Sequence, residues 1–212
     1  MNIKRLSIIL VSLGFLSGCA FGDAQLDIGY DGSKAIAGPL SKVSSQQILI
    51  REFKDERPEI NMVGYKRNGY GQHTADIKPN KPVPEIVKDA ISAVFIKGGH
   101  SVAQKANIEV SGEIKTFWFD TKTGFWTVEF MGDTAINLVV KDTDNSNIIY
   151  EKVYRGAYNE KSAGGLEKTW ERVLNGALAK MAENISLDTE LADALKKHAQ
   201  SKLLRHAELS AH

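Results

Sequence analysis

The stretch Ile108-Glu109-Val110-Ser111-Gly112-Glu113-Ile114 decides how the fold of this chain is interpreted. Apolar and polar residues alternate along it, as on a strand with one buried face. The same period of two returns over residues 125–141, and a third apolar run covers residues 148–158. The connections between the three runs, residues 120–124 and 142–147, are short enough for hairpins. We therefore expect an antiparallel meander of three strands.

Helical patterns lie on both sides of this meander. Apolar residues recur at helical spacing over residues 83–94, and a longer apolar stripe covers residues 166–185. Asp188 is placed to cap a last helix, and residues 47–53 form a further strand-like run. The sequence thus predicts one α+β domain over residues 46–197, with a small, mostly antiparallel sheet of about four strands and helices packed on one face.

Three segments carry weaker patterns. Residues 59–82, rich in Gly and Pro, are expected to form a long loop. Residues 19–45 contain many Gly, Ser, Ala and Asp residues, which favours a flexible tether, although the alternation over residues 26–30 would also fit an extra edge strand. Residues 198–212 are predicted to form a basic polar tail that frays beyond Ser201.

The first 18 residues are typical of a signal peptide that is cleaved from the mature protein. Their apolar run, residues 6–16, is about half of the ~20 residues that a transmembrane helix needs. The run leads into Leu16-Ser17-Gly18-Cys19, which resembles the lipobox of bacterial lipoproteins. The resemblance implies cleavage before Cys19 and lipidation of its thiol. The alternative is an ordinary secretory signal in which the chain's only cysteine stands by chance.

The residue after the lipobox indicates where such a lipoprotein would reside. Ala20 follows Cys19, whereas an aspartate there would resemble the inner-membrane retention signal of the enteric sorting pattern. Several acyl chains on one cysteine would make the membrane attachment durable. We therefore expect the mature protein to be anchored at the outer membrane, on its periplasmic face.

The composition argues against strongly charged partners and against a metal centre. The chain has 27 basic and 26 acidic residues, and loss of Lys4 and Arg5 with the signal peptide leaves 25 against 26. This balance gives no indication of nucleic-acid binding. The five histidines are not paired at the spacing of metal ligands. We expect no catalytic residues, no metal and no cofactor other than the covalent lipid at Cys19.

Aromatic residues in the predicted loop and around the first hairpin turn form a candidate interaction surface. Its members are Tyr65, Tyr70, Phe117, Trp118, Phe119, Phe125 and Trp126. Neighbours on a strand point to opposite faces, so Trp118 cannot share a face with both Phe117 and Phe119. Two interpretations therefore remain: a buried core with an aromatic cross-strand pair, or an exposed patch that docks onto a partner.

Several segments resemble the YajG-type family of bacterial outer-membrane lipoproteins. Besides the lipobox, the similar segments are Phe53-Lys54-Asp55-Glu56-Arg57-Pro58, Gly98-Gly99-His100-Ser101-Val102 and Tyr154-Arg155-Gly156-Ala157-Tyr158-Asn159. The resemblance covers about residues 47–197 and implies a periplasm-facing outer-membrane lipoprotein without implying a reaction. The longer loop over residues 62–82 and the tail after Lys197 depart from the family, so the resemblance implies no partner surface there.

These observations favour a non-enzymatic binding or scaffolding module that is held to the membrane by its lipid. Its expected partner is another cell-envelope protein, since membrane attachment raises the local concentration of both. One alternative is an accessory subunit of an envelope-spanning transport or secretion assembly, by analogy of fold. Another is a periplasmic hydrolase, for which the sequence offers no set of nucleophile, base and orienting group.

Overall fold

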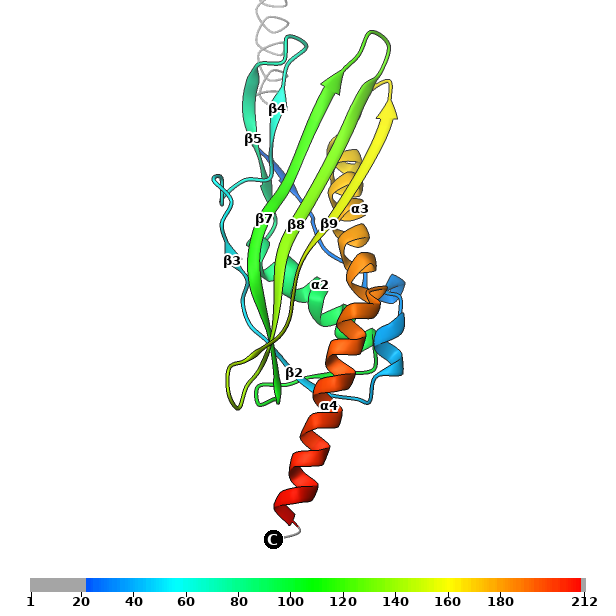
Figure 1. Ribbon diagram of the computed structural model, residues 1–212. Coiled ribbons are helices and arrows are strands. Elements are labelled where there is room, and N and C mark those ends of the chain that lie inside the picture. Colours follow the sequence, from blue (N-terminus) through cyan, green and yellow to red (C-terminus); the bar gives the residue numbers. More distant parts are fainter. Residues whose placement is uncertain (1–21, 211–212) are drawn as a thin grey trace, which may run out of the picture.

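The computed structural model describes residues 22–210, whose strands form one sheet of nine (Figure 1). At its centre lie β7 (Ile108–Thr123), β8 (Val128–Asp142) and β9 (Ile148–Ser162), paired antiparallel along almost their whole length. The predicted three-strand meander is confirmed, and the strands are longer than the apolar runs alone indicated.

A register shift between Ile114 and Thr116 changes which face of β7 is buried. Before the shift, the even-numbered residues such as Ile114 point into the core, and after it Phe117 and Phe119 do so. An extra residue in one strand has this effect because side chains alternate with a period of two. The bulge therefore places Trp118 on the opposite face.

Short strands complete the sheet along the other edge of β7. They are β1 (Ala24–Leu26), β2 (Gln47–Ile50), β3 (Lys54–Asp55), β4 (Gly64–Arg67), β5 (His73–Pro79) and β6 (Ser101–Val102). β2, β3 and β4 pair with β7 in parallel, one after another, while β6 joins β2, β5 joins β4, and β1 joins β5. The expectation of a small, mostly antiparallel sheet of about four strands is therefore wrong, although helices and strands still combine as in an α+β protein.

Two segments that were expected to be irregular belong to the fold. Residues 22–45 do not form a flexible tether: they supply β1 and two short 3-10 helices, Gly32–Lys34 and Pro39–Lys42, and they bury Leu26 and Leu40 completely. Residues 59–82 contain the β4–β5 hairpin instead of one long loop. Parallel pairing joins residues far apart in the chain, as in Ala24 opposite Ile77, so local patterns did not predict it.

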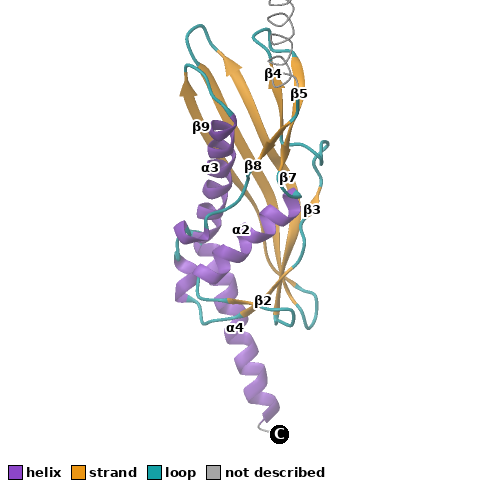
Figure 2. Ribbon diagram, turned by 180° about the vertical axis from the view of Figure 1, so that it is seen from behind, coloured by secondary structure: helices purple, strands orange, loops and turns teal. Residues whose placement is uncertain are grey.

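Two helices cover one face of the sheet (Figure 2). α2 (Val83–Lys97) follows Pro82, and the chain leaves it through Gly99, which has a φ of +86° that favours glycine. α3 (Glu167–Ser186) packs against β8 and β9. Its close approach requires Gly156 on β9, because a Cβ there would lie 2.1 Å from the carbonyl oxygen of Ala177.

The last helix, α4 (Thr189–Ser210), begins after a short break and runs past the end of the sheet (Figure 1). Leu191 and Leu195 on its first turns are fully buried, whereas Leu203 and Leu204 near its end are exposed. The predicted tail thus differs from the structure, since the helix continues to Ser210 and His198 is only 9% exposed.

Candidate binding site

The seven aromatic residues of the predicted surface occupy three environments. Phe117 and Phe119 lie in the core, each 1% exposed. On the opposite face, the half-buried rings of Tyr65 and Trp118 meet edge to face, with centroids 5.1 Å apart. The other three residues, Tyr70, Phe125 and Trp126, are exposed at the tips of two hairpins. The accessible part of the predicted surface is thus much smaller than the sequence suggested.

A groove of about 520 Å³ lies between the β4–β5 hairpin and the β7–β8 hairpin. Its apolar lining includes Phe119, Phe130 and Trp170, and the ring of Phe119 packs against each of the other two. Val128 from β8 adds an aliphatic surface. The sequence assigned Trp170 to the core stripe of a helix, and only the structure places it beside the two hairpins.

The groove exists because β4 and β7 pair at one point and then separate. Gly64 stands opposite Phe119, and a Cβ at this glycine would lie 2.6 Å from the Phe119 carbonyl oxygen. Beyond this pair, no strand within residues 22–210 adds to this edge of β7 over residues 120–123. Figure 1 shows the two hairpins diverging from there. An open strand edge presents backbone N–H and C=O groups that can pair with an added strand.

Two cations on β4 hold the rim of the groove. The ammonium of Lys66 donates to the carbonyl oxygen of Gly22 at 2.9 Å and lies 5.9 Å from the centre of the Trp170 ring. The guanidinium of Arg67 bonds the Asp120 carboxylate at 3.3 Å across the groove. These contacts tie the hairpins together and also fix the first described residues beside the groove.

One polar atom of the groove wall has no partner. The indole N–H of Trp170 is buried and finds no acceptor within the described part of the chain. Burying such a donor without an acceptor destabilises a protein by ~1–3 kcal/mol. The ring is thus positioned by its contacts with Phe119 and with Lys66, and not by a hydrogen bond of its own.

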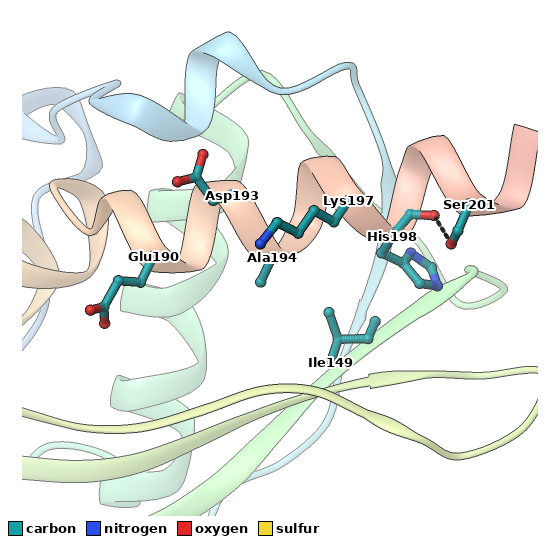
Figure 3. Close-up of a pocket in the computed structure, with 7 residues that line it drawn as sticks. All are labelled: Ile149, Glu190, Asp193, Ala194, Lys197, His198 and Ser201. Carbon is teal, nitrogen blue, oxygen red and sulfur yellow. Dashed lines mark hydrogen bonds between the residues drawn. The ribbon is translucent and has the colours of Figure 1, made fainter.

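A second depression lies between α4 and β9 at the other end of the molecule (Figure 3). It is lined by Ile149 and by a row of α4 residues, among them Lys197, His198 and Ser201. Glu190, Asp193 and Lys197 are exposed, and Figure 3 shows their side chains pointing in different directions. The depression is open, and its mixed charges converge on no single point.

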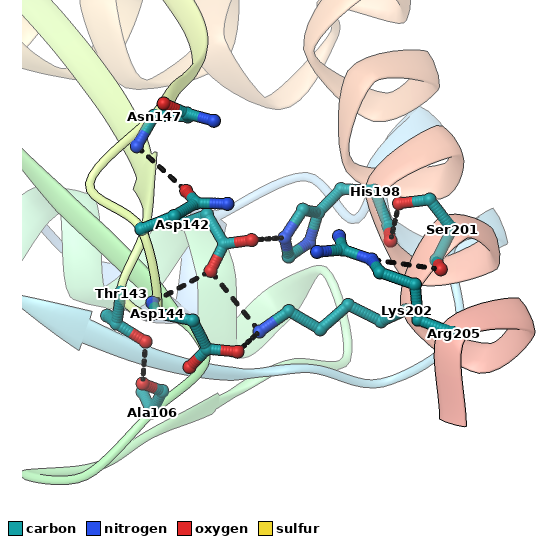
Figure 4. A network of polar contacts seen from close by, with 10 residues as sticks. Ala106, Asp142, Thr143, Asp144, Asn147, His198, Ser201, Lys202 and Arg205 are labelled. Atoms are coloured by element: carbon teal, nitrogen blue, oxygen red, sulfur yellow. Dashed lines mark hydrogen bonds and ion pairs between the residues drawn. The ribbon is translucent and has the colours of Figure 1, made fainter. Parts of the chain in front are cut away.

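A polar network next to this depression fastens α4 to the β8–β9 turn (Figure 4). The carboxylate of Asp142 contacts His198 Nε2 at 3.0 Å and the Lys202 ammonium at 3.2 Å, and Lys202 also binds Asp144 at 2.6 Å. Burial raises the pKa of Asp142, but hydrogen bonds from His198, from the Asp144 N–H and from Lys202 together lower it to about 2. The sequence analysis missed this network, because Asp142 and Asp144 lie more than 50 residues from His198 and Lys202 along the chain.

Ser201, His198 and Asp142 are the residue types of a hydrolase triad, but their geometry differs from one. The Ser201 hydroxyl donates to the backbone carbonyl of His198 at 2.9 Å, and not to the imidazole. The second imidazole nitrogen, Nδ1, is buried without a partner among the described residues. In a triad the nucleophile would contact this nitrogen. The arrangement therefore joins α4 to the sheet instead of activating a hydroxyl.

The predicted cap of the last helix is confirmed. One oxygen of Asp188 accepts the backbone N–H groups of Glu190 and Leu191 at 2.8 and 3.1 Å. Its other oxygen accepts from Tyr150, Lys152 and Tyr154 on β9. Asp188 therefore both begins α4 and binds it to the edge strand of the sheet, which the sequence pattern did not indicate.

The described residues do not include the predicted membrane anchor. Cys19, the predicted lipidation site, and the predicted signal peptide, residues 1–18, lie outside residues 22–210. Within that range no three His, Cys, Asp or Glu residues are grouped as ligands of a metal ion. No helix in the same range is long and apolar enough to cross a membrane.

One of the solved structures compared with the chain shares this fold at low sequence identity, and two others are less similar. Protein XCC0632 from Xanthomonas campestris, of family DUF330, superposes with a TM-score of 0.57 at 11% identity, over 84% of this chain and 97% of that one. A minor lipoprotein from Acinetobacter baumannii reaches 0.43 at 6% identity over 70% and 93% of the two chains. Protein CT253 from Chlamydia trachomatis reaches 0.42 at 8% over 72% and 98%. The first of these likenesses shows the fold alone.

Sequence comparison identifies the family. No curated protein matches the chain. The pattern of one family, Lipoprotein_16, described as uncharacterised lipoproteins, matches residues 38–196. The match ends within α4, so His198 and Lys202 of the polar network lie beyond it. Because it spans well over half of the sequence, this chain belongs to the uncharacterised lipoprotein family Lipoprotein_16.

Proposed function

We propose that this protein is a YajG-type lipoprotein, anchored through Cys19 at the periplasmic face of the outer membrane, which binds another envelope protein without catalysing a reaction. Membership of a lipoprotein family and the lipobox-like sequence before Cys19 support the anchor. The groove between the β4–β5 and β7–β8 hairpins is the proposed binding site.

The observation that carries the proposal is the combination of an apolar floor with an open strand edge in one groove. An extended segment of a partner can pair with the free backbone of β7 over residues 120–123. Because side chains of a strand alternate between its two faces, those on one face of that segment would lie against Phe130 and Trp170. Main-chain pairing supplies affinity in this mode, and the apolar floor supplies selectivity.

Anchoring explains why a groove of this size is sufficient for binding. A lipid confines the domain to the membrane surface, where an envelope partner is also confined, so a weak contact is occupied by mass action. The non-enzymatic role is supported by the contacts of Ser201, whose hydroxyl is engaged with a backbone carbonyl, and by the structural role of His198. The binding function that we infer therefore depends on the apolar floor of the groove and on the open edge of β7.

The proposal can be tested by photocrosslinking in intact cells that make the full-length protein. A photoreactive amino acid at Thr121, inside the groove, should give one discrete adduct with an envelope protein. The same amino acid at Lys88, on the exposed side of α2, should give none. Introducing Val128→Asp should abolish the Thr121 adduct, because a carboxylate would then be forced against the apolar floor.

A matched variant controls for the added charge. Val153→Asp changes the same side chain at an exposed position on β9 and should leave the Thr121 adduct intact. An adduct of equal strength at Lys88, or one that survives Val128→Asp, would show that the groove is not the binding site.

A further inference from the structure

Three exposed aromatic residues occupy the tips of two hairpins at one end of the molecule. Tyr70 lies in the β4–β5 turn, and Phe125 and Trp126 lie in the β7–β8 turn. They are 93%, 90% and 83% exposed, respectively, and the last two rings meet edge to face at 4.7 Å. We call these three residues the tip patch. Figure 1 shows both hairpin tips at the end of the molecule opposite to the C-terminal part of α4.

The turn segments that carry the tip patch contain no carboxylate. Residues 66–75 and 121–128 include no aspartate or glutamate. They include the cation Lys122, whereas Lys66 and Arg67 are engaged with the Gly22 carbonyl and the Asp120 carboxylate. Such turns can approach phospholipid headgroups without desolvating a carboxylate of their own, and Lys122 adds a positive charge near the phosphates. Tryptophan and tyrosine are also the residues that concentrate at membrane–water interfaces.

The first described residues enter the fold from the same end of the molecule. β1 runs parallel to β5, with Ala24 opposite Ile77, so the chain enters from the side of the hairpin tips. Lys66 fixes the entry by binding the carbonyl oxygen of Gly22, and Lys78 does so by binding the Asp23 carboxylate at 2.6 Å.

The length of chain between Cys19 and Gly22 is compatible with contact of the anchor and the tip patch with the same membrane surface. Ala24 stands opposite Ile77, so Gly22, two residues earlier, is level with Ala75. Gly71, in the β4–β5 turn, precedes Ala75 by four residues, which corresponds to ~13 Å along a strand. Cys19 precedes Gly22 by three residues, a reach of at most ~10 Å. Full extension of these three residues would bring Cys19 nearly level with Gly71, so the lengths allow the anchor and the tips to meet one surface.

We propose that the tip patch inserts into the phospholipid interface of the membrane that holds the anchor. This inference rests on the proposed lipidation of Cys19, and it adds a second attachment that sets the orientation of the domain. The strands of the meander then stand on the membrane, and α4 points away from it (Figure 1). The acyl chains of Cys19 would hold the protein at the membrane without fixing how the domain is turned, and side chains inserted at the interface would fix it.

Fluorescence of the acylated, full-length mature protein on vesicles tests the inference. The vesicles contain phosphatidylethanolamine and phosphatidylglycerol, with or without bromine atoms on the acyl chains, which quench nearby indoles. Brominated vesicles should reduce the emission of the wild type and of Trp118→Phe, which keeps Trp126. They should have little effect on the emission of Trp126→Phe, because its remaining tryptophans, Trp118 and Trp170, are packed against the body of the domain.

Sedimentation with the vesicles separates this inference from the proposed function. Acylated protein that sediments but shows equal quenching with and without Trp126 would overturn insertion of the tips while leaving the anchor intact. Tips covered by a second copy of the protein would give this same result, since brominated lipid would then not reach Trp126. A native protein without acyl groups on Cys19 would instead contradict the proposed function.

Discussion

Asp188 allows the sharpest test of how this fold is stabilised. The residue is 8% exposed, and its carboxylate accepts five hydrogen bonds of 2.8 to 3.1 Å. The donors are the hydroxyls of Tyr150 and Tyr154, the ammonium of Lys152, and the backbone N–H groups of Glu190 and Leu191. We predict that Asp188→Asn weakens the fold in a way that depends on pH.

The expected magnitude follows from the pKa of the carboxyl group. Burial raises the pKa of Asp188, but the hydrogen bonds it accepts lower it from 3.8 to about 2. Because each pKa unit corresponds to ~1.4 kcal/mol, the charged form contributes about 2 kcal/mol to the free energy of unfolding. The folded-state pKa lies below the unfolded one, so this contribution is complete above a pH of about 4 and is lost as the pH falls through about 2.

Urea unfolding followed by circular dichroism, between neutral pH and pH ~2, measures this contribution. Asparagine is also a good N-cap, so Asp188→Asn removes the charge and keeps the cap. The variant should be less stable than the wild type by about 2 kcal/mol at neutral pH, with the gap closing at the acid end. Asp193→Asn, at an exposed position of the same helix, should show no gap. A gap that does not change with pH would refute the reasoning.

Three further predictions concern other parts of the fold. Asp142→Asn should weaken the network that holds α4, so amide exchange should accelerate over residues 198–205 and stay unchanged over residues 189–196. Gly156→Ala should lower the free energy of unfolding by ~1–3 kcal/mol or more, because its methyl group would lie 2.1 Å from the Ala177 oxygen; equal stability in urea would contradict this. Trp170→Phe keeps an aromatic ring against Phe119 and removes an unpaired buried donor, so thermal unfolding should show unchanged or higher stability; a clear loss would reveal a hydrogen bond to the indole.

Local sequence patterns predicted the candidate binding site only in part. Sequence analysis found the aromatic residues around the first hairpin, but it left open which of them are exposed. The bulge between Ile114 and Thr116 decided this, since one extra residue turns Phe117 and Phe119 inward and Trp118 outward. A register shift of this kind depends on the pairing with β8, and the alternating pattern of β7 alone does not reveal it.

The sequence by itself determined the meander, α2, α3 and the start of α4, because each carries a periodic pattern or a capping residue within its own span. Only the tertiary structure decided the parallel pairing of β1 with β5 and of β2, β3 and β4 with β7. It also decided the hairpin within residues 59–82 and the burial of His198. Their partners lie tens of residues away along the chain, as in the contact of His198 with Asp142. The polar, Gly-rich segments, residues 22–45 and 59–82, are ordered by contacts with residues that are distant in the chain. Composition predicts flexibility only where such contacts are absent.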